Sequence, residues 1–168
     1  IELIIAEPTA GAALEAAQRT GALQVAHPAL TWDGARSEAL ANPIVPRVPL
    51  LPYGFALLAA GSSPDDAPLI VARLKLKRDE AAAVTAIASM RKVAQTLRRP
   101  DAKPSGVVIL LDRFPIAAVA AHAAMEPDTI ARRLALRYLE EWRHIKPALN
   151  GDELIELGVP AGPQVKRG

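Results

Sequence analysis

Four basic residues stand within six positions in the middle of the chain, at Arg73, Lys75, Lys77 and Arg78. Cations at this density bind phosphate oxygens, and a helix that begins beside them adds backbone N–H donors. The spacing predicts contacts with the phosphate backbone of RNA. The alternative is a solvated surface on which these residues pair with Asp79 and Glu80, and exposed pairs of this kind contribute little to stability.

A second basic group lies nearer the C-terminus, at Arg132, Arg133 and Arg137. We take Arg132 and Arg133 as further candidates for binding RNA phosphates. Ion pairing with acidic neighbours on the same helix explains the group equally well, and those neighbours are Asp128, Glu140 and Glu141. Both interpretations stay open from the residues alone.

The charge of the chain is unevenly distributed. Residues 1–72 contain three Lys/Arg and seven Asp/Glu, a net charge of −4, whereas residues 73–168 contain seventeen and eleven, a net charge of +6. A basic part beside an acidic part points to a polyanionic partner for one face of the molecule.

The residue patterns of common catalytic and metal centres are absent from the sequence. No histidine is followed by aspartate, so the His-Asp doublet of a metal phosphohydrolase does not occur, and we expect His27, His122 and His144 to be structural. Asp65 and Asp66 are adjacent and are better explained by helix capping. Without cysteine, disulfides and thiolate ligands are excluded. The sequence favours binding over catalysis, with no cofactor of its own.

The elements that must position these residues are expected to be helices. Hydrophobic residues make up 51% of the chain, largely alanine and leucine, which favours closely packed helices. The apolar run 107–114 fits a strand or a helix, and the lack of a second strand candidate favours the helix. We therefore predict an all-α fold, a multi-helix array broken by proline and glycine. No apolar run reaches the roughly 20 residues of a membrane span, so we expect no membrane association and a cytoplasmic location.

Several boundaries follow from local signals. Gly21 is expected to end a helix that begins near residue 12, and Asp33-Gly34 is expected to form a turn. A long helix is predicted over 77–97. Another is predicted from Pro127 to its end before Pro147, with one apolar stripe that consists of Ile130, Leu134, Tyr138, Trp142 and Ile145.

After Pro147 the chain reads NGDELIELGVPAGP over residues 150–163. This order is a helix N-cap, a short apolar helix, a glycine C-cap and a proline at the next N-terminus. The whole string resembles the C-terminal motif of the class II tRNA nucleotidyltransferase and bacterial poly(A) polymerase family. The matching residues are Gly151, Asp152, Leu154, Leu157, Gly158, Val159, Gly162 and Pro163. Glu153 and Lys166 depart from the family pattern.

Two other stretches are similar to the same family. The tail signature is matched by Arg73, Leu74, Lys75, Leu76 and Glu80. Lys77 departs from it, because the family usually has serine or threonine there. Near the start, Glu2 and Leu3 resemble the end of a neck motif, and a looser run is formed by Gly11, Leu14, Gly21, Leu23 and Pro28.

The resemblance implies an organisation and a function. Residues 1–60 would be the end of the neck and the body helices, and 61–168 the tail helices, in one continuous helical unit. Such helices hold tRNA or another structured RNA by its shape and phosphates. Nucleotides are added by a head domain whose D-x-D pair holds two Mg²⁺ ions. That pair is absent here, so Mg²⁺ and ATP or CTP are expected only in a head, and this stretch is expected to be a non-catalytic fragment of a longer nucleotidyltransferase.

A second hypothesis belongs to a different class of function. Alanine-rich helical faces can dock a partner protein or form a homodimer without any RNA. The chain would then be a helical scaffold whose basic residues only keep its surface solvated.

Overall fold

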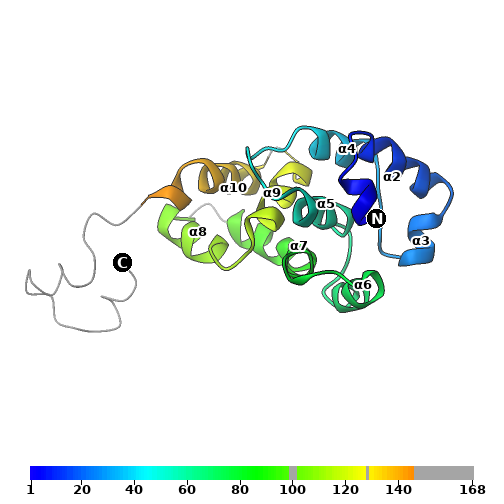
Figure 1. The fold of residues 1–168 in the computed structure, drawn as a ribbon. Coiled ribbons are helices and arrows are strands. Elements are labelled where there is room, and N and C mark those ends of the chain that lie inside the picture. Colours follow the sequence, from blue (N-terminus) through cyan, green and yellow to red (C-terminus); the bar gives the residue numbers. More distant parts are fainter. Residues whose placement is uncertain (99–101, 128, 146–168) are drawn as a thin grey trace, which may run out of the picture.

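The computed structural model describes residues 1–98, 102–127 and 129–145. In these ranges the chain forms ten α-helices, one 3-10 helix and no strand, so the all-α prediction is confirmed. The elements are α1 (Glu2–Ile5), α2 (Ala10–Arg19), α3 (Ala22–Ala26), α4 (Gly34–Ala41), α5 (Leu50–Leu58), α6 (Asp66–Leu74), α7 (Arg78–Leu97), α8 (Pro104–Leu111), α9 (Ile116–Met125), α10 (Ile130–Glu140) and η1 (Trp142–His144) (Figure 1). The motif at 150–163, with Pro147 and Lys166, lies outside the described residues.

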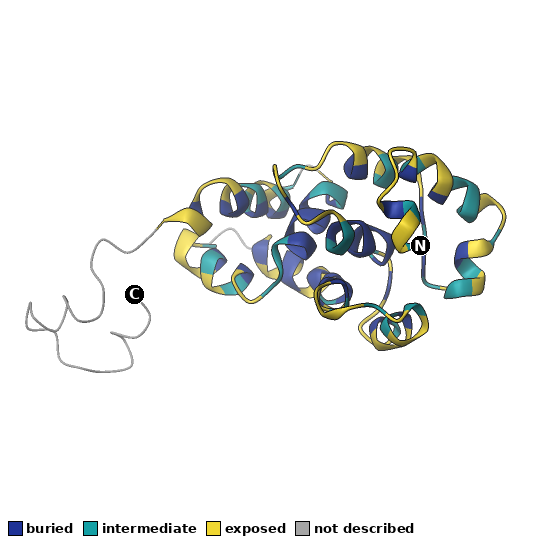
Figure 2. Ribbon diagram, in the orientation of Figure 1, coloured by how far each residue is buried: buried dark blue, intermediate teal, exposed yellow. Residues whose placement is uncertain are grey.

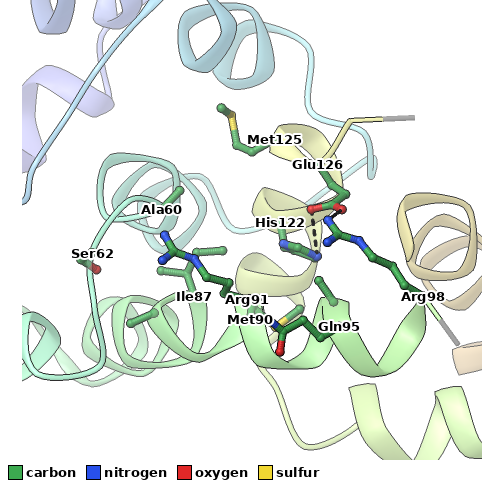
Figure 3. Close-up of a pocket in the computed structure, with 12 residues that line it drawn as sticks. Ala60, Ser62, Ile87, Met90, Arg91, Gln95, Arg98, His122, Met125 and Glu126 are labelled. Atoms are coloured by element: carbon green, nitrogen blue, oxygen red, sulfur yellow. Dashed lines mark hydrogen bonds and ion pairs between the residues drawn. The ribbon is translucent and has the colours of Figure 1, made fainter. Parts of the chain in front are cut away.

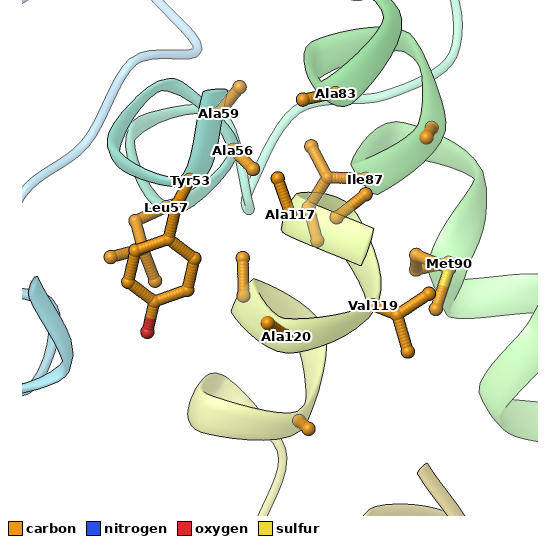
Figure 4. Packing of buried hydrophobic residues seen from close by; sticks show 14 of the residues in the cluster. Tyr53, Ala56, Leu57, Ala59, Ala83, Ile87, Met90, Ala117, Val119 and Ala120 are labelled. Carbon is orange, nitrogen blue, oxygen red and sulfur yellow. The ribbon is translucent and has the colours of Figure 1, made fainter. Parts of the chain in front are cut away.

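Helix α5 occupies the centre of the molecule, and residues 53–58 are all buried. It packs against α7 and α9, and it also contacts α1 and α4. Small side chains such as Ala56 of α5 and Ala120 of α9 line these contacts (Figure 4). Alanine lets helix axes approach closely, so the alanine-rich composition becomes a tightly packed three-helix centre.

Gly54 is required for the contact between α1 and α5. A Cβ atom at this position would lie 2.6 Å from Cγ2 of Ile5, closer than packed atoms approach. Ile5 is itself buried, at 1% exposed. The missing side chain therefore sets how close the first helix lies to the central one.

Several local predictions are confirmed. Gly21 follows α2 with a φ of 76°, the left-handed conformation that ends many helices. Helix α7 runs over Arg78–Leu97 and buries the residues expected on its apolar side, Val84, Ile87, Ala94 and Leu97. The ambiguous run 107–114 contributes to α8, a helix that packs against α10.

The predicted turn at Asp33-Gly34 is wrong. Asp33 is the N-cap of α4, and its carboxylate accepts a hydrogen bond of 2.9 Å from the backbone N–H of Arg36. An aspartate before a glycine serves a turn or a cap, and here the cap satisfies a helix donor that would otherwise be unpaired.

The predicted long helix from Pro127 is also corrected. Helix α10 begins at Ile130, because Thr129 caps it by accepting from the N–H of Arg132 at 3.3 Å. Its α-helical geometry ends at Glu140, and η1 follows. Ile130 and Ile145 are 44% and 70% exposed, so the stripe is shifted. Tyr138 and Trp142 of the predicted stripe are buried and Leu134 is partly buried, and the buried face is completed by Ala131, Ala135 and Leu139. The small side chains fit against α9, which a rule based on large apolar residues overlooks.

Burial follows one face of each outer helix, and the central helices are buried on almost all sides (Figure 2). Within the described ranges no single helix is both long and apolar enough to cross a bilayer. Helices α8 and α9 pass that test only as a pair bent by 118°, and α9 is buried in the core.

Candidate nucleic-acid interface

Helix α6 ends with a lysine where glycine is usual. Lys75 has φ 52° and ψ 46°, the left-handed conformation. Its N–H donates to the carbonyl of Ala72 at 3.4 Å, and the N–H of Leu76 donates to the carbonyl of Val71 at 3.2 Å. These two bonds are the Schellman arrangement that closes a helix. They fix the backbone so that Lys75 stands at the tip of the turn between α6 and α7.

Helix α7 starts two residues later, with Lys77 as its N-cap and Arg78 as its first residue. The four basic residues predicted to bind RNA, Arg73, Lys75, Lys77 and Arg78, are all exposed. They therefore lie at one junction, on both sides of a sharp reversal of the chain. We call these four residues the junction cluster.

The ion pairs of the junction cluster differ from those considered from the sequence. Lys77 Nζ lies 2.5 Å from Glu2 Oε1, and this hydrogen bond raises the pKa of Lys77. Both side chains are exposed, at 70% and 48%, so the pair adds little stability. Arg73, Lys75 and Arg78 form no ion pair with any residue whose placement the structure describes.

Glu80 is withdrawn from the surface of this junction. It is 6% exposed, and its Oε2 has no hydrogen-bond partner among the described residues. A recess of about 140 Å³ is lined by Glu80, Glu2, Lys75 and Lys77 together with apolar residues. Of the nearby carboxylates, only Glu2 and Asp79 are exposed, so the junction presents more positive than negative charge to solvent.

The second basic group is held by contacts within the chain. Arg132 is half-buried and its Nη1 donates to the carbonyl of Glu126 at 3.2 Å. Arg137 lies 3.2 Å from Glu141 and 4.9 Å from the centre of the Trp142 ring. Arg133 is exposed on the same helix. The ion-pairing interpretation therefore applies to Arg137.

A third polar group, which the sequence analysis did not identify, lines a recess between α7 and α9. Its members are Arg91 and Gln95 of α7 with Arg98 at the C-cap of that helix, and His122 of α9 with Glu126 at the C-cap of that helix (Figure 3). The signal was present in the sequence as helical spacing: positions 91, 95 and 98 share one face of a helix, and so do 122 and 126. Alanines between the polar residues made α9 look like packing surface only.

Glu126 connects the two helices at this recess. Its Oε1 accepts a hydrogen bond from Arg98 and another, of 3.2 Å, from the hydroxyl of Thr129. Its Oε2 lies 3.9 Å from Nε2 of His122. Burial lowers the pKa of His122, Glu126 opposes that shift, and Arg98 adds to it. His122 is 8% exposed, and the structural role expected for it stays a prediction.

The described residues contain no group of three or more His, Asp or Glu side chains that could hold a metal ion. The fold and surface thus define an all-α module with a cationic junction and a separate polar recess. The sequence matches no protein-family model, no curated protein and no solved structure.

Proposed function

We propose that this chain is an RNA-binding helical module whose junction cluster contacts the phosphate backbone of a tRNA or another structured RNA. It would belong to a protein similar to the tRNA nucleotidyltransferases and poly(A) polymerases, and it would position the RNA acceptor end for a nucleotidyltransferase head. The observation that carries the binding proposal is the left-handed conformation of Lys75.

A left-handed backbone costs a residue with a side chain roughly 1–2 kcal/mol, and glycine avoids that cost. Residues in this conformation are concentrated at functional sites. The Schellman bonds at this turn need no side chain from Lys75. A lysine here places an ammonium group at the tip of an exposed turn, which is useful to a phosphate ligand but not to folding.

The start of α7 supports the same function. Lys77 makes no side-chain capping hydrogen bond, so the first N–H groups of this 20-residue helix lack that partner within the chain. The helix dipole adds partial positive charge at the same end. Basic side chains and helix N–H groups together bind the nucleic-acid backbone without reading its sequence.

Reversing Lys75, Lys77 and Arg78 to glutamate is expected to remove most of the affinity for a tRNA minihelix. The slope of log affinity against log salt should also fall, by about one for each RNA phosphate that the variant no longer binds. Fluorescence anisotropy over a salt series measures both quantities. As a matched control, Lys92, Lys103 and Arg113 are exposed elsewhere, and reversing them changes the net charge equally. Equal losses in both triple variants would overturn the site assignment.

A single substitution separates binding from folding. Lys75→Gly removes the cation and relieves the left-handed strain, so it should weaken RNA binding while raising the unfolding free energy by about 0.5–1 kcal/mol. Chemical denaturation and anisotropy on the same sample measure the two effects. RNA affinity equal to that of wild type would count against a contact at this position.

The scaffold hypothesis is constrained by burial. Ala117, Ala118, Ala120, Ala121 and Ala123 of α9 are at most 2% exposed within one chain. A homodimer would have to use another surface than this alanine-rich face. Light scattering with an RNA gel shift separates the hypotheses, because a dimer that ignores RNA would favour the scaffold.

A further inference from the structure

Helix α8 is apolar on nearly all sides but is packed on only one of them. Residues 107–111 are all hydrophobic. Val107 and Leu111 are buried, at 2% and 0% exposed, whereas Ile109 is 58% exposed and Leu110 is half-buried. A helix that is hydrophobic all round is normally buried, so the outer side of α8 lacks a cover among the described residues.

A groove runs along the same helix. It has a volume of about 400 Å³ and lies between the end of α7 and α8. Its lining consists of Thr96, Leu97, Ala102, Lys103, Gly106, Val107 and Leu110. Lys103 is the one charged residue in the described part of this lining. The groove and the outer side of α8 therefore form one largely apolar surface.

The chain itself has an apolar and acidic segment a short distance further on. Residues 152–159 read DELIELGV, with hydrophobic side chains at Leu154, Ile155, Leu157 and Val159 and three carboxylates between them. In the short helix that the sequence predicts there, Leu154 and Leu157 would share one face. We call residues 152–159 the acidic segment, which lies outside the described residues.

The described chain ends beside α8. Helix η1 contacts α8, and Ile145 follows η1 directly. Figure 1 shows α8 and η1 at the same end of the molecule. Leu154 comes nine positions after Ile145, and nine extended residues span at most about 30 Å, whereas the eight residues of α8 span about 12 Å. The acidic segment can therefore reach α8, and its covalent link raises its effective concentration to about millimolar.

The charges around the groove suit this segment. Lys103 lines the groove, and Lys92 lies on α7 one turn before Thr96, on the same face of that helix. Both lysines are exposed, and α8 itself has no charged residue. Two cations beside an apolar surface complement a segment whose carboxylates alternate with hydrophobic residues.

We propose that the acidic segment packs its hydrophobic side chains on the outer side of α8 and places its carboxylates near Lys92 and Lys103. The contact forms within one chain, covers Ile109 and Leu110, and fills the groove between α7 and α8. It goes beyond the proposed RNA binding and does not rest on it, because the junction cluster lies at the other end of α7.

A single introduced thiol tests whether α8 is covered, because the chain contains no cysteine. In Ile109→Cys, the thiol should react slowly with a thiol reagent. Adding Leu154→Asp and Leu157→Asp should speed that reaction by about tenfold or more, since a contact that is open 10% of the time or less protects to that degree. Val25→Cys on α3, at a site 78% exposed, should react at a rate that the two aspartates do not change.

A matched pair of substitutions controls for charge. Ala161→Asp with Val165→Asp adds the same two charges beyond the acidic segment, and it should leave the thiol of Ile109→Cys protected. Lys103→Glu should speed the reaction of that thiol by roughly two- to fivefold, as expected for an exposed ion pair. Arg19→Glu, at an exposed arginine on α2, should not. Circular dichroism checks that each variant keeps its helices.

Equal rates for Ile109→Cys with and without the two aspartates at 154 and 157 would overturn the proposal. Protection that grows with protein concentration would also overturn it, because the cover would then be a second copy of the chain. Reversal of the junction cluster should weaken RNA binding and leave the thiol of Ile109→Cys protected. The two proposals can therefore fail separately.

Discussion

Hydrogen bonds to buried side chains link helices that are distant in sequence. The hydroxyl of Tyr53 donates to the carbonyl of Ala39 at 3.0 Å, and burial raises the pKa of Tyr53 to about 12, so it remains a donor. The hydroxyl of Tyr138 donates to Asp112 at 2.7 Å. In the described ranges only Glu80 Oε2 and His122 Nε2 are buried side-chain atoms without a partner. Both residues line recesses. Because buried polar atoms are normally paired, an unpaired one at a recess calls for an explanation.

His122 makes stability depend on pH. Because burial lowers its pKa in the folded state, the unfolded chain, whose histidine titrates near pH 6.5, takes up the proton first. The stability that the neutral His122 contributes is fully present above the unfolded-state pKa. It is lost as the pH falls from there toward the lower folded-state pKa, by at most about 1.4 kcal/mol per pH unit. Urea denaturation between about pH 5 and 7.5 measures this slope.

His122→Gln should flatten the same profile, because the variant has no imidazole to protonate. His27→Gln is the comparison, since that side chain lies in a loop and only its Nδ1 is engaged, as the acceptor from the N–H of Ala29. A slope unchanged in the His122 variant would show that other groups cause the acid sensitivity.

At the scale of elements, helix ends and close approaches determine how α1, α5, α6 and α7 are arranged. The start of α6 is closed by a reciprocal pair: Asp66 accepts from the N–H of Ser63 at 2.8 Å, and Ser63 Oγ accepts from the N–H of Asp66 at 3.2 Å. The capping role expected from the sequence is confirmed for Asp66, whereas Asp65, the N-cap residue, makes no side-chain capping hydrogen bond. The end of α6 is closed by the turn that carries Lys75. Helix α6 is thus closed by side-chain caps at its start and by backbone hydrogen bonds at its end, and the second set positions the junction cluster.

Gly54→Ala is expected to lower the unfolding free energy by about 1–3 kcal/mol, because the new methyl group overlaps Ile5 in a filled core. Gly106→Ala in α8 is the matched control. Apart from its chain neighbours and its own helix backbone, no atom of the described residues lies within 4 Å of a Cβ at that position, so the higher helix propensity of alanine should stabilise the protein, by up to about 1 kcal/mol. Thermal and urea unfolding measure both. A neutral Gly54→Ala would mean that α1 can move away from α5 without cost.

At the scale of the whole molecule, one cluster of buried side chains extends from Ile5 in α1 to Trp142 in η1. Helix α5, placed by the sequence analysis in the first part of the chain, packs mainly on α7 and α9 of the second part. We therefore expect residues 1–60 and the helices that follow to unfold together.

The two tryptophans report on the two ends of this cluster. Trp32 is 3% exposed, and its indole N–H donates a hydrogen bond of 2.9 Å to the hydroxyl of Ser37. Trp142, in η1, is 8% exposed. In each of the variants Trp32→Phe and Trp142→Phe, one tryptophan remains as the fluorescence reporter. For each variant, the fluorescence unfolding curve should coincide with the unfolding curve of the same variant measured by circular dichroism, which follows the loss of helix. An early transition seen by only one tryptophan would indicate two separately folding units.

The sequence predicted features that depend on near neighbours. Helical periodicity located α7, and Gly21 marked the end of α2, because a few adjacent residues decide both. It failed where two local solutions were equally good, as at Asp33, and where a tertiary contact chose between large and small residues, as on α10. It also missed the recess at His122, since its two sides come from different helices.

The amino-acid order alone determined the all-α class and the density of cations at 73–78, because composition and spacing along one chain are enough for both. Only the tertiary structure decided that Lys77 pairs with Glu2, 75 positions away, and that Arg91 lies with His122 beside one recess. Such proximities depend on how close helices lie, and that is set by packing at residues such as Gly54 rather than by any local pattern.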